Sequence, residues 1–226
     1  NSVAMYTISM VSLGCPKNQV DAEMMLATLK TSGFEIGVPE AEADAIIINT
    51  CGFIEDAKKE AIENILEAAE YKKTGKCKAL IVTGCLAERY KNDVTEEIPE
   101  FDVCVGIGAD GDIAEIVTDA LNGSKENVFA DKYDLNLNSD RILGGYPFST
   151  YLKIGDGCDN CCTYCAIPKI RGRMRSRTIE DCVKEAAELA AGGVKELTVV
   201  AQDTTAYGED IYGKPMLAKL LRELCK

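Results

Sequence analysis

A run of apolar, mostly β-branched residues at 45–49 constrains the fold of this chain more than any other segment. Its sequence, Ala-Ile-Ile-Ile-Asn, lacks polar alternation, which is typical of a strand buried on both faces of a parallel sheet. Similar strand-like runs lie at 6–13 and 80–82, and amphipathic helix-like segments at 19–31 and 54–72 separate the three runs. This alternation predicts an α/β fold with a doubly wound parallel sheet.

The domain organisation follows from the same pattern. Residues 1–4, which precede Met5, resemble a vector remnant. Residues 5–125 are expected to form the N-terminal α/β domain, and residues 126–149, rich in Asn, Gly, Ser and Asp, a linker. Residues 150–226 contain only two further βα units, too few to close a barrel. We therefore expect a fragment of a longer enzyme; the alternative is a small open sheet on the first domain.

Composition excludes several classes of protein. The 226 residues contain no histidine, which removes Ser-His-Asp and Cys-His catalysis and His-ligated zinc. Eleven cysteines in a long chain without a recognisable secretory signal indicate a reducing cytoplasm. No apolar run reaches the roughly 20 residues needed to span a membrane. Residues 1–150 carry 13 basic and 26 acidic side chains, which favours a basic protein partner.

Four cysteines lie close together in the loop at 157–165, directly after a strand-like run. Cys158, Cys162 and Cys165 have the spacing Cys-x-x-x-Cys-x-x-Cys, which would leave one iron of a cubane cluster without a protein ligand. The alternative is a zinc site or structural cysteines, but four thiolates crowded into one short loop suit zinc poorly. Cys161 completes no three-cysteine pattern, so we expect it not to be a ligand.

A second set of cysteines is spread over the N-terminal half. Cys15, Cys51 and Cys85 each follow the end of a predicted strand by one to three residues. Because ligands bind beyond the carboxyl ends of parallel strands, three such cysteines can converge on one cluster. The alternative is three unrelated buried cysteines, which does not suit strand-end loops. The remaining cysteines are expected to pack as small apolar residues: Cys77, Cys104, Cys182 and Cys225.

Together these motifs resemble the methylthiotransferase family of radical S-adenosylmethionine (SAM) enzymes. The likeness begins at Met5 and covers nearly the whole chain. Within the family, Ser-Leu-Gly-Cys-Pro-Lys-Asn at 12–18 is similar to the branch that acts on an aspartate of ribosomal protein S12. Further motifs point the same way, at 151–154, 167–172 and 201–205.

The resemblance implies two [4Fe–4S] clusters and SAM as cofactors, with the chemistry on these groups and no catalytic side chain. The cluster on Cys158, Cys162 and Cys165 would bind SAM within an incomplete TIM-like barrel. The cluster on the other three cysteines would present the sulfur, and a methylthio group would reach the β-carbon of an aspartate. Four residues are expected to contact SAM: Tyr164 at the adenine, Gln202 at the amino group, and Arg171 and Arg173 at the carboxylate.

The resemblance also implies partners. We expect ribosomal protein S12 or the small ribosomal subunit as substrate, a reductant such as flavodoxin or ferredoxin, no membrane, and a monomer. The rest of the barrel and a C-terminal TRAM domain are missing from the chain. Two alternatives remain at this point: a methylthiotransferase acting on transfer-RNA adenosine, and a non-catalytic iron–sulfur or zinc module.

Two further patterns have more than one interpretation. Residues 106–111 match Gly-x-Gly-x-x-Gly, but two aspartates there would repel a pyrophosphate, so we interpret the segment as a turn with a helix start. Five cations alternate from Lys169 to Arg177, which predicts an extended segment with its charges on one side. They would contact the SAM carboxylate, ribosomal RNA or acidic partner side chains, or form a solvated stripe paired with the acidic domain.

Overall fold

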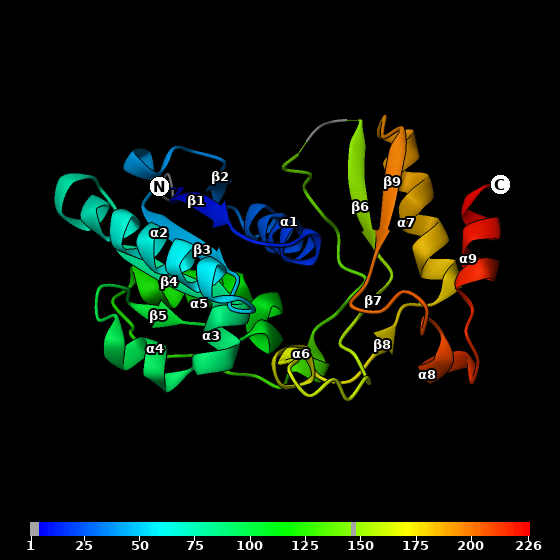
Figure 1. Cartoon of the computed structure of the whole chain (residues 1–226). Coiled ribbons are helices and arrows are strands. Elements are labelled where there is room, and N and C mark those ends of the chain that lie inside the picture. Colours follow the sequence, from blue (N-terminus) through cyan, green and yellow to red (C-terminus); the bar gives the residue numbers. More distant parts are fainter. Residues whose placement is uncertain (1–4, 146–147) are drawn as a thin grey trace. The chain divides into compact units, whose positions relative to one another are not determined.

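The computed structural model describes residues 5–145 and 148–226, without the side chain of Asn92. The expected vector remnant and residues 146–147 of the expected linker lie outside the described residues. The chain forms two compact units (Figure 1). The first runs to Leu135 and includes Asp140–Ile142, and the second contains Asn136–Ser139 and Leu143–Lys226.

The first unit is built on a five-stranded sheet with the order β2-β1-β3-β4-β5. All neighbouring strands pair in parallel, so the predicted doubly wound sheet is confirmed. In register, Ser12 pairs with Asn49 and Asn49 with Thr83, so the three central strands end level with one another. The strands are β1 (Thr7–Ser12), β2 (Glu35–Ile36), β3 (Ala45–Thr50), β4 (Ala79–Gly84) and β5 (Val103–Cys104).

Helices cover both faces of this sheet, because side chains of β3 alternate between two buried clusters. Ile46 and Ile48 pack in the cluster that includes Ile65 of α2. Ile47 packs in the opposite cluster, which includes Leu29 of α1 and residues of α5. The helices of this unit are α1 (Pro16–Thr31), α2 (Glu55–Thr74), α3 (Cys85–Tyr90), α4 (Asn92–Glu97) and α5 (Ile113–Leu121), with 3-10 turns η1 (Glu40–Glu42), η2 (Ile107–Asp112) and η3 (Lys132–Asp134).

Part of the segment expected to be a linker packs against the first unit. The backbone N–H of Gly106 donates to the Val128 carbonyl at 2.8 Å, and the N–H of Val128 donates to the Cys104 carbonyl at 3.0 Å. The Phe129 ring packs against the same hydrophobic cluster as α2. Residues 128–129 therefore extend the edge of the sheet next to β5.

The second unit contains two βα units in sequence. Strands β6 (Ser149–Lys153) and β9 (Glu196–Val200) pair in parallel, and α7 (Ile179–Ala191) connects them. Helix α9 (Leu217–Leu224) packs with α7 over a core that includes Leu152, Tyr207 and Leu220. Four short elements were not expected: α6 (Ile167–Arg171), α8 (Glu209–Tyr212), and the strands β7 (Gly155–Asp156) and β8 (Arg175–Ser176), which pair in antiparallel fashion.

Helix α7 begins after a threonine N-cap. The Thr178 hydroxyl accepts a hydrogen bond from the backbone N–H of Asp181 at 3.1 Å, as an N-cap residue should. Among the residues that the structure describes, no helix combines the length and the apolar character needed to cross a membrane.

Candidate metal and cofactor sites

The first cysteine set lies at the point where the strand order reverses. In the order 2-1-3-4-5, successive connections leave β1 and β3 in opposite directions, and ligands of doubly wound sheets bind in the crevice at this switch point. Cys51 directly follows β3, Cys85 directly follows β4, and Cys15 lies three residues beyond β1. The structure therefore places all three cysteines beyond the carboxyl ends of adjacent strands.

The three cysteine loops also touch one another through glycines. A Cβ built on Gly14 would lie 2.6 Å from Cβ and 3.1 Å from Sγ of Cys51. A Cβ on Gly52 would lie 2.7 Å from Cα of Leu86, the residue after Cys85. Gly14 also has a φ of 95°, a conformation that favours glycine. Any larger residue at either position would push neighbouring cysteine loops apart.

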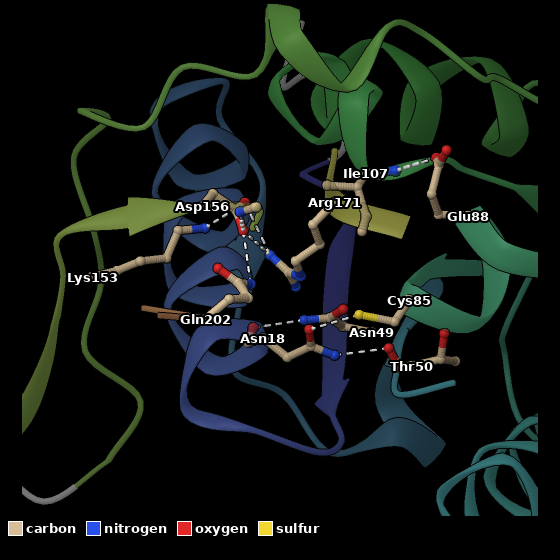
Figure 2. A network of polar contacts seen from close by, with 11 residues as sticks. Asn18, Asn49, Thr50, Cys85, Glu88, Ile107, Lys153, Asp156, Arg171 and Gln202 are labelled. Carbon is tan, nitrogen blue, oxygen red and sulfur yellow. Dashed lines mark hydrogen bonds and ion pairs between the residues drawn. The ribbon is translucent and has the colours of Figure 1, made fainter. Parts of the chain in front are cut away.

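A buried asparagine links the same loops. Asn18 is fully buried, and its Nδ2 donates to the Leu13 carbonyl at 3.2 Å and to the Thr50 carbonyl at 2.7 Å. The thiol of Cys85 donates to Oδ1 of Asn18 at 3.5 Å. Nδ2 of Asn49 donates to the backbone carbonyl of Asn18 at 2.7 Å. Figure 2 shows the contacts of Asn18 with Thr50, Cys85 and Asn49.

The chemistry of this set suits a cluster with three thiolate ligands. None of the eleven cysteines, all within the described residues, is part of a disulfide. Cys15 and Cys51 are half-buried and Cys85 is buried. No group of three Cys, Asp or Glu side chains among the described residues is arranged to hold a single metal ion. A cubane binds each thiolate at a different iron, so its ligands need not converge on one ion.

The second cysteine loop follows β7 and is fixed at its base. Gly157 has a φ of 78°, and a Cβ there would overlap the Arg173 carbonyl oxygen. The backbone N–H of Cys158 donates to the Gly172 carbonyl at 3.1 Å, and that of Met174 donates to Oδ1 of Asp159 at 3.1 Å. These contacts tie both sides of the loop base together, so Gly157 is needed for the loop to close.

The predicted ligands of this loop are accessible. Cys162 is exposed, and Cys158 and Cys165 are half-buried. Cys161 is exposed as well, so exposure alone does not separate it from the ligands. The side chain of Tyr164 is 86% exposed, which leaves the face of its ring available to a planar group.

A buried carboxylate organises the base of this loop. Asp156 accepts hydrogen bonds from Lys153 Nζ at 3.2 Å, from Arg171 at 3.1 Å and from the backbone N–H of Gly157 at 3.0 Å. Nε2 of Gln202 donates to it at 3.0 Å (Figure 2). Burial alone would raise the pKa of Asp156, but the charges of Arg171 and Lys153 outweigh burial and lower the pKa below its usual value.

The residues expected to contact SAM occupy different environments. Arg171 is buried in its ion pair with Asp156, whereas Arg173 is exposed. Gln202 is half-buried, and its Oε1 is a buried acceptor without a hydrogen-bond partner among the described residues. Because Nε2 donates to a carboxylate, the orientation of this amide is well defined. Its carbonyl oxygen is thus an acceptor suited to a cofactor amino group.

The expectation of an extended cationic segment is wrong. Lys169 and Arg171 lie in helix α6, and only Arg175 belongs to a strand. Arg171 and Arg177 are both buried, and Arg177 pairs with Glu185 within the second unit. Burial against specific carboxylates has overridden the alternating pattern. The prediction for the remaining cysteines holds for three of the four, since Cys225 is exposed.

The Gly-x-Gly-x-x-Gly segment is a turn followed by a helix start, as expected. The carboxylate of Glu88 accepts a hydrogen bond from the backbone N–H of Ile107 at 3.2 Å. A Cβ on Gly106 would lie 2.6 Å from the same carboxylate. Lys91 and Lys132 form ion pairs with Glu88. An internal carboxylate therefore occupies the position that a phosphate would need.

Sequence reasoning missed two residues that organise these sites, Asn18 and Asp156. Asn18 is the last residue of the motif at 12–18, three residues after Cys15, and Asp156 directly precedes the loop at 157–165, two residues before Cys158. A polar residue near a cysteine ligand, such as Asn18 or Asp156, can be recognised as one that holds the cysteine loop in place only when its burial is known.

Comparison with known proteins agrees with the division of the chain into two units. Residues 152–226 match the radical SAM superfamily, and residues 7–106 match the uncharacterized protein family UPF0004. The C-terminal unit is thus of the radical SAM class. The chain is similar to the methylthiotransferases of the radical SAM superfamily, as the motifs predicted. The match also agrees with the expected cofactors, SAM and [4Fe–4S] clusters.

Several relatives are named ribosomal protein uS12 methylthiotransferase RimO. That of Desulforamulus reducens is 51% identical over 222 residues, which cover 97% of this chain and 50% of the relative. That of Clostridioides difficile is 51% identical over 224 residues, which cover 98% of this chain and 50% of the relative. The chain spans about half the length of the curated relatives it matches.

A solved structure shares the fold. The radical SAM methyltransferase TsrM from Kitasatospora setae, with tryptophan substrate and a SAM analog bound, aligns with a TM-score of 0.65 at 14% identity. The alignment covers 96% of this chain and 50% of TsrM. At this identity the likeness supports the α/β architecture alone.

Proposed function

We propose that this chain is part of an enzyme that transfers a methylthio group to the β-carbon of an aspartate in ribosomal protein uS12. One observation carries the proposal: the sheet brings the loops of Cys15, Cys51 and Cys85 together in a chain that also contains a three-cysteine radical SAM loop. Two three-thiolate sites suit a reaction that both activates a carbon and supplies sulfur. Relatives named for uS12 modification support this substrate over transfer RNA.

The proposed roles follow from the environments of the side chains. Cys158, Cys162 and Cys165 would hold the cluster that binds SAM; together, cluster and SAM supply hydrogen-atom abstraction from an unactivated carbon. Oε1 of Gln202 would accept from the SAM amino group, and the exposed Tyr164 ring would lie against the adenine.

Two arginines would act on the SAM carboxylate in different ways. Arg173 is exposed and would donate to the carboxylate directly. Arg171 would contribute mainly its charge, because its guanidinium is buried against Asp156.

Further domains and partners belong to the same proposal. Residues 5–125 would form the cluster-bearing N-terminal domain, 126–149 the linker, and 150–226 the start of the radical SAM barrel. The remainder of the barrel and a TRAM domain would lie elsewhere in a protein of the length of the relatives. The enzyme would act in the cytoplasm as a monomer, with an electron donor such as flavodoxin or ferredoxin. The acidic first 150 residues suit a basic partner.

The test uses the full-length protein that contains this chain, reconstituted anaerobically with iron and sulfide. Incubation with uS12, SAM and a reductant should add the mass of one methylthio group at a single aspartate, and incubation with transfer RNA should add none. Modification of transfer RNA alone would reverse the assignment. Cleavage of SAM without methylthiolation of either substrate would refute the transferase.

Metal analysis of the chain itself gives an independent check. Two cubanes predict about eight irons per chain, and one predicts about four. Zinc in place of iron would support the non-catalytic module instead.

A further inference from the structure

The side chain of Asn18 has hydrogen bonds to all three loops that carry Cys15, Cys51 and Cys85. It lies in the first turn of α1 and is fully buried. Nδ2 donates to the Leu13 carbonyl, two residues before Cys15, and to the Thr50 carbonyl, one residue before Cys51. Its Oδ1 accepts from the thiol of Cys85.

The two hydrogen bonds from Asn18 to backbone carbonyls hold two of the cysteine loops together. An amide nitrogen has two hydrogens, and at Asn18 each goes to a different loop: one to the Leu13 carbonyl at 3.2 Å, the other to the Thr50 carbonyl at 2.7 Å (Figure 2). These bonds hold the chain just before Cys15 against the chain just before Cys51. They do not depend on the protonation state of any cysteine.

The third bond responds to metal. Cys85 donates its thiol proton to Oδ1 of Asn18, but a cysteine that binds iron does so as a thiolate and has lost that proton. Iron binding to Cys85 would therefore break this hydrogen bond and leave the two hydrogen bonds from Asn18 to backbone carbonyls intact. Asn18 would then hold the other two loops in place while Cys85 changes its partner.

We propose that Asn18 is a positioning residue that presets the spacing of the three cysteine loops for iron–sulfur binding. The proposal rests on the proposed cluster at Cys15, Cys51 and Cys85. Supporting residues around metal ligands commonly matter for affinity because they fix the ligands before the metal arrives. No other residue type of this size offers two donors and one acceptor on a planar group.

The experiment isolates the first cluster. A parent chain with Cys158→Ala, Cys162→Ala and Cys165→Ala removes the second cysteine set, so bound iron reports the first set alone. Into this parent we introduce Asn18→Ala. The matched control is Asn127→Ala, because Asn127 lies in the same unit, accepts from the backbone N–H of Cys104 at 2.8 Å and donates to Thr95, and both of these partners lie outside the three cysteine loops.

The readouts are the rate at which a chelator extracts iron and the electron paramagnetic resonance spectrum of the reduced cluster. For Asn18→Ala we expect extraction to be about 10–100-fold faster than from the parent, the range seen when supporting residues of metal sites are removed. The spectrum should also shift. Asn127→Ala should match the parent in both measurements. Equal extraction rates and spectra for Asn18→Ala and the parent would overturn the proposal.

Two further outcomes are distinguishable. If the parent binds no iron although Asn18 is present, the proposed first cluster fails and this inference falls with it. If Asn18→Ala and the milder Asn18→Ser both lose helical circular dichroism without metal while Asn127→Ala keeps it, Asn18 is required for folding rather than for positioning. Folded variants that bind iron more weakly, with Asn18→Ser between Asn18→Ala and the parent, support the proposal.

Discussion

Replacing Asp156 with asparagine should loosen the base of the second cysteine loop without changing the shape of the side chain. The carboxylate is fully buried and accepts from two cations, Lys153 and Arg171, as well as from Gln202 and the backbone of Gly157. Removing one partner of a buried ion pair typically costs about 3–5 kcal/mol. Because Lys153 and Arg171 each have further interactions, we expect the lower end, about 3 kcal/mol.

Hydrogen–deuterium exchange with peptide resolution measures this effect within one molecule. A loss of about 3 kcal/mol corresponds to roughly a hundredfold faster exchange for amides of β6, β7 and the start of the cysteine loop. Peptides of the first unit provide the internal control. Asp203→Asn is the matched variant, since Asp203 is only half-buried and bonds to Asn160 and Thr205; it should change exchange far less.

The pH dependence adds a second check. Since the pKa of Asp156 is lowered in the folded chain, its stabilisation is fully present above the usual carboxyl pKa of about 3.9 and is lost as pH falls through the lowered value. The difference between native chain and Asp156→Asn should therefore be constant from neutral pH down to about pH 5. Unchanged exchange in the second unit, or a difference that vanishes above pH 5, would refute this account of Asp156.

Three other predictions concern the cysteines and their loops. Gly157→Ala should abolish iron at the second cluster, because its Cβ would overlap the Arg173 carbonyl; iron per chain should fall by half, and an unchanged content would contradict the geometry. Cys161→Ala should keep its iron whereas Cys162→Ala should lose the second cluster; equal losses would show that Cys161 is a ligand. Burial raises the pKa of Cys104 to about 12 and of Cys182 to about 11, so iodoacetamide at pH 8 should spare both in the native apo chain and label the exposed Cys161 and Cys162. Mass spectrometry of the alkylated peptides measures this, and rapid labelling of Cys104 would show that its burial is wrong.

The sequence predicted those parts of the fold that depend on local pattern. The run at 45–49 identifies β3 because all six residues of that strand are buried, so no alternation is needed. The placement of Cys15, Cys51 and Cys85 next to one another could also be predicted. It depends only on where the three strands end, and the local pattern shows this. Strand β2, by contrast, has two residues and forms only because β1 pairs with it.

The second unit was harder to predict because its short elements depend on distant partners. The burial of Arg171 requires Asp156, fifteen residues earlier in the chain. The segment therefore forms helix α6 followed by a strand, although its alternation of cations is typical of an extended, solvent-exposed segment. Asn18 was missed for a related reason: its role follows from bonds to Thr50 and Cys85, which only the folded sheet brings near.

The spread of the first cysteine set over three strands has a consequence for assembly. Cys15 and Cys85 are seventy residues apart and meet only when β1, β3 and β4 are paired, whereas Cys158 and Cys165 lie within one loop. Closing a long stretch of chain removes more freedom from the unfolded state than closing a short one. A cluster on the first set would thus cross-link the three central strands β1, β3 and β4 and make unfolding of that unit depend on iron. The second loop closes too few residues for a cluster there to stabilise its unit in this way. Under iron starvation, the N-terminal unit should therefore be degraded first.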